Sequence, residues 1–126
     1  MTNDEEVRRI ALTLPEATVN GSAFEIAEKG FAWFYQEKVA GQKGRVERRD
    51  VLVVRVAHRD DKAALLASAP EKFFTTDHYN GYPAIMVRLP AIDSEELTEL
   101  LTDAWRSRAP RKLLAAFDAA NSPIRK

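Results

Sequence analysis

Apolar side chains recur at two spacings along the chain, and each spacing predicts a different kind of element. Spacings of three and four residues, bounded in several places by proline, predict helices at residues 3–14, 60–69, 93–107 and 110–120. Helix caps are expected at Asn3, at Asp93 and at either Asp60 or Asp61. Helices are therefore expected at both ends of the chain and in its middle.

Alternating or β-branched runs lie between these helices and predict strands at residues 23–28, 31–37, 51–56, 73–75 and 84–89. Residues 16–22 are expected to form a loop. In the second strand Phe31, Trp33 and Tyr35 fall on one face, which is therefore wholly aromatic and is expected to join the core. Residues 38–50 hold two glycines and five cations, which favours a solvated, mobile hairpin extension over a core strand.

The order of the predicted elements is helix, three strands, helix, two strands and two helices. Strand runs interrupted by single helices, with short turns between adjacent strands, indicate an α+β fold with an antiparallel sheet. We expect a two-layer sandwich with the helices packed on one face of the sheet. With 126 residues the chain is long enough for one core, and residues 1–126 are expected to form a single domain.

The composition narrows the possible chemistry. Cysteine is absent, which excludes disulfides, thiolate metal sites and cysteine nucleophiles. His58 and His78 are the imidazoles of the chain, and neither has a second ligand at helical or hairpin spacing, so no metal or cofactor is expected. The pair Asp77-His78 could belong to a catalytic triad, but the sequence has no Gly-x-Ser-x-Gly turn that would supply the nucleophilic serine. A hydrolase is therefore not indicated, and we expect a protein that is not an enzyme.

The ends and the hydropathy of the chain bear on its location. No apolar run approaches the roughly 20 residues of a membrane span. The first six residues are polar and acidic, which is the opposite of a secretory signal. A cytoplasmic protein that does not enter the membrane is therefore expected.

The net charge of zero conceals four blocks of alternating sign. Residues 1–28 carry a net charge of −4, residues 29–62 of +4, residues 63–104 of −5 and residues 105–126 of +5. If the two basic blocks meet on one surface, they form a basic patch that suits a polyanion. The alternative is that blocks of opposite sign neutralise each other across the fold.

Two clusters of cations are candidates for contact with DNA, because neutralising phosphates supplies much of the affinity of such complexes. One cluster lies on the expected hairpin and the other at the junction of the last two helices: Arg45, Arg48 and Arg49, and Arg106, Arg108, Arg111 and Lys112. The isoelectric point of about 6.7 and the absence of a helix-turn-helix or zinc-finger motif argue against a dedicated DNA-binding domain. In the alternative interpretation, some of these cations only complement helix dipoles.

The turn at residues 76–83 is a candidate ligand site. It brings together the carboxyl of Asp77, the imidazole of His78 and the phenols of Tyr79 and Tyr82, which could bind a ligand or stack on a base. Trp33 is a further candidate that could meet Tyr79 and Tyr82 in a groove, although the sequence does not place these residues side by side. In the alternative, structural interpretation Asp77 caps backbone amides, the tyrosines border the core and Gly81 supplies the positive φ of a tight turn.

Four strings resemble the MmcQ/YjbR-like family and together cover nearly the whole chain: Val7-Arg-Arg-Ile-Ala-Leu-Thr-Leu-Pro15, Lys29-Gly-Phe-Ala-Trp33, Phe73-Phe-Thr-Thr-Asp-His-Tyr-Asn-Gly-Tyr-Pro83 and Ala109-Pro-Arg-Lys112. The resemblance implies a compact two-layer domain similar to secretion-chaperone-like folds, in a bacterial protein. Members are usually described as DNA-binding proteins.

Three functions follow as expectations from the residues and the resemblance. The first is weak, largely sequence-independent DNA binding through the basic segments. The second is a protein-interaction or chaperone-like module that uses the open face of the sheet, in a monomer or a weak homodimer. The third is a small-ligand site at residues 76–83.

Overall fold

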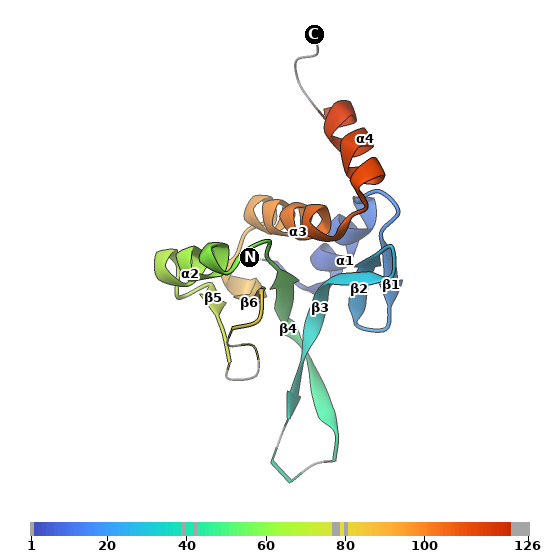
Figure 1. The fold of residues 1–126 in the computed structure, drawn as a ribbon. Helices are drawn as coiled ribbons and strands as arrows, with labels where there is room; N and C mark the ends of the chain where they lie inside the picture. Colours follow the sequence, from blue (N-terminus) through green and yellow to red (C-terminus); the bar gives the residue numbers. More distant parts are fainter. Residues whose placement is uncertain (1, 39, 42, 77–78, 80, 122–126) are drawn as a thin grey trace.

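Six strands of the computed structural model form one antiparallel sheet in the order β1-β2-β3-β4-β6-β5 (Figure 1). The structure describes residues 2–38, 40, 41, 43–76, 79 and 81–121. In chain order the elements are α1 (Asp4–Thr13), β1 (Thr18–Asn20), β2 (Ala23–Ile26), β3 (Lys29–Lys38), β4 (Arg45–Arg55), α2 (Arg59–Ser68), β5 (Phe73–Phe74), β6 (Ala84–Arg88), the short 3₁₀ helix η2 (Leu89–Ala91), α3 (Ser94–Arg108) and α4 (Arg111–Asn121). The α+β fold with an antiparallel sheet is confirmed.

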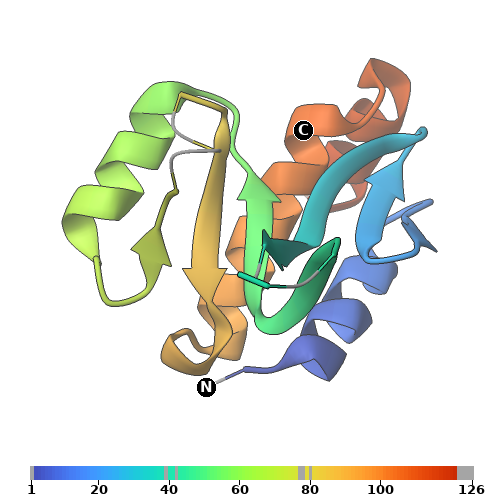
Figure 2. The ribbon, with the colours of Figure 1, turned by 90° about the horizontal axis from the view of Figure 1, so that it is seen from below.

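The helices lie on one side of the sheet, as the sequence predicts. In Figure 2 the sheet faces the viewer and α3 lies behind it, while the hairpin of β3 and β4 projects from the opposite side of the sheet to α3 and α4 in Figure 1. The main core fills the space between sheet and helices. Its members alternate along each strand, so that Leu52 and Val54 of β4 and Ile85 and Val87 of β6 point towards the helices.

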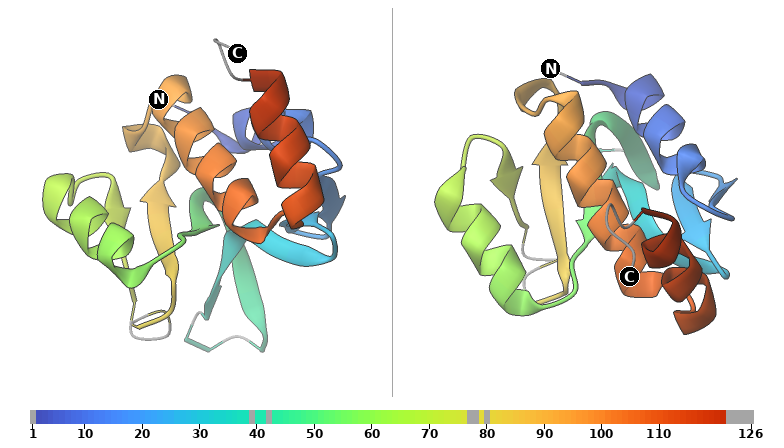
Figure 3. Two further views of the ribbon diagram at one scale, coloured as in Figure 1. Left: turned by 45° about the horizontal axis from the view of Figure 1, so that its top comes forward. Right: turned by 90° about the horizontal axis from the view of Figure 1, so that it is seen from above.

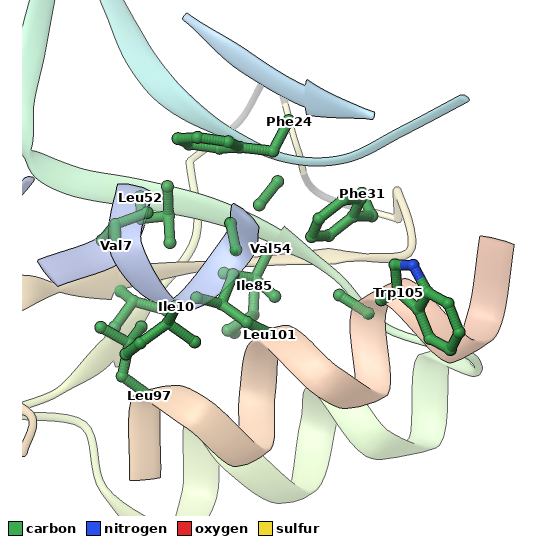
Figure 4. Close-up of a cluster of buried hydrophobic side chains, with 14 of the residues drawn as sticks. Val7, Ile10, Phe24, Phe31, Leu52, Val54, Ile85, Leu97, Leu101 and Trp105 are labelled. Atoms are coloured by element: carbon green, nitrogen blue, oxygen red, sulfur yellow. The ribbon is translucent and has the colours of Figure 1, made fainter. Parts of the chain in front are cut away.

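Residues at helical spacing complete this core from the other side (Figure 4). Val7 and Ile10 of α1 and Leu97 and Leu101 of α3 are almost completely buried. Trp105 is also fully buried, and its indole Nε1 donates a hydrogen bond to the carbonyl oxygen of Pro15 at 3.0 Å. Both predicted N-caps of these helices form, because the side chains of Asn3 and Asp93 accept from the backbone amides of Glu6 and Glu96.

Three local predictions are wrong. Residues 16–22 contain the strand β1, which pairs with β2 and is exposed along its whole length. The sequence indicates a loop because a run of three residues is too short to define a strand, and Asn20-Gly-Ser22 is typical of turns. The N-cap of α2 is His58, which makes no capping hydrogen bond with its side chain, so neither Asp60 nor Asp61 occupies that position.

The third error concerns the aromatic face of β3. Phe24 pairs with Ala32 but Glu25 pairs with Gly30, so Phe31 is an extra residue in a β-bulge. The bulge lets Phe31 enter the main core, whereas Trp33 packs against the opposite face of the sheet. Period-two alternation therefore fails at this one position.

A second irregularity separates the sheet from the hairpin. Phe34 pairs with Leu52, but the next residue, Tyr35, pairs with Arg48. β4 consequently bends at residues 49–51, and the outer part of the hairpin leaves the plane of the sheet (Figure 1). Lys38 still pairs with Arg45, so the predicted hairpin extension is confirmed.

Candidate functional site

The two predicted cation clusters lie on opposite sides of the molecule. The hairpin with Arg45, Arg48 and Arg49 projects from one side of the sheet, and the junction of α3 and α4 lies on the other (Figure 1). The two cation clusters therefore do not form one basic patch, and the alternative of local neutralisation describes the fold better.

Carboxylates hold several of these cations. Arg48 lies 2.6 Å from Glu37 and 3.2 Å from Asp50, and these hydrogen bonds raise the pKa of its guanidinium. The remaining ion pairs of the clusters join Arg49 to Glu47 and Asp4, and Arg106 to Asp118. Such pairs are worth little to stability at an exposed surface, but they reduce the charge that is available to a phosphate.

The other members of the two clusters carry no carboxylate partner within the described part of the chain. Arg45 donates to the carbonyl oxygen of Gln36 at 3.2 Å. Arg111 and Lys112 are exposed at the start of α4. Arg108 is half-buried, and its Nε has no hydrogen-bond partner. These four cations are spread over both sides of the fold and do not form one site.

A second apolar cluster covers the face of the sheet on which the described residues place no α-helix. We call it the helix-free face. Val53, Ala84 and Met86 are fully buried at its centre. Partly buried side chains from β3, β4, β5 and the 76–83 turn surround them: Trp33, Tyr35, Val51, Phe74 and Tyr79. The helix-free face is therefore rich in aromatic side chains that keep part of their surface in solvent.

Two arginines stand over aromatic rings at the border of this face. The guanidinium carbon of Arg88 lies 4.2 Å from the ring centre of Phe74, and that of Arg55 lies 5.2 Å from the ring centre of Tyr82. Arg88 donates to the carbonyl oxygen of Pro70 at 3.1 Å, and Arg55 to the hydroxyl of Tyr82 at 3.0 Å. Neither arginine forms an ion pair with a carboxylate among the residues that the structure describes.

A hollow of about 380 Å³ adjoins Arg88 on this face. Its lining includes Arg48 and Asp50 of the hairpin and Val51 beside them. Val51 and Arg88 are paired across β4 and β6, so the hollow lies where the hairpin leaves the sheet. Two guanidinium groups thus border one open space.

The 76–83 turn closes the other end of the helix-free face. The hydroxyl of Tyr79 accepts a hydrogen bond from the indole Nε1 of Trp33 at 3.0 Å, which places these two candidate residues side by side. The ring of Tyr79 meets that of Tyr82 edge-on, with ring centres 5.9 Å apart. Gly81 has the positive φ of 84° that the turn needs. Asp77 and His78, which the sequence proposes as ligand groups, lie outside the described residues.

Lys62 anchors this turn from α2. Its side chain is almost completely buried, and its Nζ donates to the carbonyl oxygens of Tyr79 at 2.6 Å and Tyr82 at 2.9 Å. A buried ammonium requires such acceptors. The sequence analysis missed this residue, because nothing in the order of residues indicates which lysine of a helix turns inward.

Arg88 and Arg55 were not among the predicted site residues, although the alternation of side chains along β6 and β4 points to both. Ala84, Met86 and Arg88 alternate along β6 with Ile85 and Val87 of the main core, which assigns Arg88 to the opposite face. Arg55 follows Val51 and Val53 at the same spacing. Sorting cations by strand face, and not by clusters along the chain, would have selected both.

Metal and membrane chemistry receive no support from the described part of the chain. No three His, Asp or Glu residues there lie close enough together to hold a metal ion. None of its helices is long and apolar enough to span a bilayer.

Comparison with known proteins places the chain among uncharacterized relatives. A family model described as YjbR matches residues 12–107. Uncharacterized proteins of Mycobacterium tuberculosis strain H37Rv and Mycobacterium bovis strain AF2122/97 are each 48% identical to the chain over 73 residues. The matches cover 58% of this chain and 56% of each relative, so the chain spans little more than half of their length. No solved structure matches significantly.

Proposed function

We propose that this chain, which belongs to the YjbR family, binds single-stranded DNA weakly and with little sequence preference through the helix-free face of its sheet. The observation that carries the proposal is the position of Arg88, whose guanidinium lies over the ring of Phe74 without a carboxylate partner in the described part of the chain. An arginine held in this way presents a positive charge and a flat stacking surface at the same point.

The aromatic side chains favour a single strand over a duplex. Bases that are already unpaired can stack on exposed rings, and each such contact is worth about 1–3 kcal/mol without regard to sequence. Tyr82 is 41% exposed, and Tyr35 and Phe74 are partly exposed on the same face. The bases of a duplex are stacked on each other and cannot use these rings.

The arginines set the expected strength of the complex. Among the described residues Arg88 and Arg55 pair with no carboxylate, whereas Arg48 would first have to leave Glu37 and Asp50. Two or three phosphate contacts correspond to a slope of roughly −1.4 to −2 in a plot of log affinity against log salt for a single strand. Weak, strongly salt-dependent binding is the expected result.

The protein-interaction alternative would use the same face. A protein partner would cover the same aromatic side chains but would not produce the salt slope of a polyanion. Ligand binding at the 76–83 turn would be restricted to Tyr79, Tyr82 and their neighbours. In either case we propose that the protein acts in the cytoplasm by binding and not by catalysis.

The test is fluorescence anisotropy with a labelled 15-base oligothymidine and its duplex, between 25 and 200 mM salt. Arg88→Gln should lower the affinity for the single strand about 3–10-fold and reduce the salt slope by about 0.7, the share of one phosphate contact. Phe74→Leu should lower the affinity by a similar factor and leave the slope unchanged, because it removes stacking and no charge.

Arg49→Gln is the matched control. It removes the same charge from an arginine that lies between Glu47 and Asp4 and away from the helix-free face. It should change the affinity less than twofold. Equal losses from Arg88→Gln and Arg49→Gln, or a preference for the duplex, would contradict the proposal.

A further inference from the structure

A groove lies on the helical side of the molecule, away from the helix-free face. Its volume is about 630 Å³. α2 forms one wall, α3 forms the other, the end of β4 supplies the floor at Val56 and Leu114 of α4 closes one end. Figure 3 shows α2 and α3 on the same side of the sheet, with α4 beyond α3. Half of its twelve lining residues are apolar.

The walls show that the groove is elongated. On α2 the lining residues are Asp61, Ala64, Leu65 and Ser68, and on α3 they include Leu100, Asp103 and Ser107. Each set spans seven residues on one face of its helix, which is two turns or about 11 Å. The volume of about 630 Å³ then corresponds to a mean cross-section of roughly 60 Å², compared with roughly 80 Å² for a helix about 10 Å across. A helix would fill the groove and leave its outer edge in solvent.

The charges of the walls select the kind of helix. Asp61 lies on one wall and Asp103 on the other, and neither forms an ion pair within the described residues. Arg106 of the lining is paired with Asp118, whereas Arg55 lies over the ring of Tyr82, which leaves its charge in place. Each wall therefore carries one carboxylate without an ion pair among the described residues, and Arg55 is the lining cation without one.

We propose that this groove binds a basic amphipathic helix of a partner protein. Apolar side chains spaced i, i+3, i+4 and i+7 would lie on Val56, Leu65 and Leu100, and lysine or arginine side chains beside them would reach Asp61 and Asp103. The site shares no apolar residue with the helix-free face, but Arg55 borders both sites, so the variants that test the groove leave Arg55 unchanged.

The probe is a 14-residue peptide of leucine and lysine, with leucine at those spacings and lysine elsewhere, titrated calorimetrically into the full chain. The variant carrying both Asp61→Asn and Asp103→Asn should bind the peptide at least tenfold more weakly. Its matched control carries Asp60→Asn and Glu99→Gln, which remove the same charge from exposed positions of α2 and α3 outside the groove. The control should stay within twofold of the unmodified protein.

A steric variant tests the location without changing charge. Ala64 lines the groove but is exposed, so Ala64→Trp should fill the groove, abolish peptide binding and leave the melting temperature nearly unchanged. The proposal is overturned if a peptide with glutamate in place of lysine binds equally well, or if both charge variants weaken binding to the same extent. It is also overturned if the peptide does not bind and sedimentation reveals a dimer that Ala64→Trp dissociates, because a second copy would then occupy the groove.

Discussion

Lys62 shows how much of this fold depends on a single polar side chain. It is 6% exposed and joins α2 to the 76–83 turn through two carbonyl oxygens. Lys62→Met keeps the aliphatic stem and removes both hydrogen bonds. We expect the free energy of unfolding to fall by about 1–2 kcal/mol, measured by urea denaturation, and the amide of Tyr82 to exchange faster with solvent.

Lys72→Met is the comparison for this substitution. Lys72 forms a more exposed pair with Glu96 at 2.8 Å, away from the turn. Its removal should lower stability by less than about 1 kcal/mol and leave the exchange of Tyr82 unchanged. If Tyr82 responds equally to both substitutions, Lys62 has no special part in holding the turn.

Residue types were easier to predict than their partners. Trp33 and Tyr79 were both candidate ligand residues, but the sequence did not place them side by side, and the hydrogen bond between them was found only in the structure. The sequence gave no means of predicting that Arg48 would meet Glu37, since that contact depends on the register of a hairpin. Most arginines and lysines of the two predicted clusters are exposed, but the sequence did not identify the carboxylates with which several of them pair.

At the scale of elements, long periodic segments were predictable and short irregular ones were not. α3 was expected at residues 93–107 and occupies Ser94–Arg108, because a capping residue and an apolar stripe both define it. β1 and the bulges in the pairings of β3 lack such signals, because they depend on neighbouring strands. The bulge at Phe31 nevertheless directs Phe31 into the main core and leaves Trp33 on the helix-free face.

A hydrogen bond between two helices predicts a pH dependence of stability. The hydroxyl of Ser94, at the start of α3, donates to the carboxylate of Glu6 in α1. This bond, together with Arg9, lowers the pKa of Glu6 below its usual 4.5. A carboxyl with a lowered folded-state pKa stabilises the fold above its unfolded-state value, and that contribution is lost as the pH falls through the folded-state value.

Ser94→Ala should therefore lower the melting temperature at pH 7 and have progressively less effect below about pH 4.5. Calorimetric scans between pH 3 and pH 7 would measure the difference. Ser68→Ala supplies the control, because the Ser68 hydroxyl donates to the carbonyl oxygen of Leu65 and to no carboxylate. A difference between Ser94→Ala and the unmodified protein that stays constant with pH would show that the Glu6 carboxylate is not involved.

At the scale of the whole molecule, charges of one sign gather locally although the chain is neutral. α3 carries exposed carboxylates at Glu95, Glu99 and Asp103 on the helical side, where Arg111 and Lys112 are exposed as well. The hairpin, on the other side, carries exposed cations at Lys38, Lys43 and Arg45. The outer hairpin can therefore attract a polyanion to its own side of a neutral chain.

Removing the outer hairpin tests this long-range effect. Residues 38–45 contain three cations and no acid, and Glu37 pairs with Val46 just inside them. Replacing residues 38–45 by Asn-Gly should thus close a two-residue turn on an intact pair. We expect the affinity for single-stranded DNA to fall severalfold at 25 mM salt and the loss to shrink towards 200 mM, since salt screens charges that do not touch the ligand.

Substituting Lys38, Lys43 and Arg45 with glutamine should reproduce this loss, because it removes the same charge without shortening the hairpin. If only the shortened hairpin loses affinity, the extension contacts the DNA directly and its charge is not what attracts the strand.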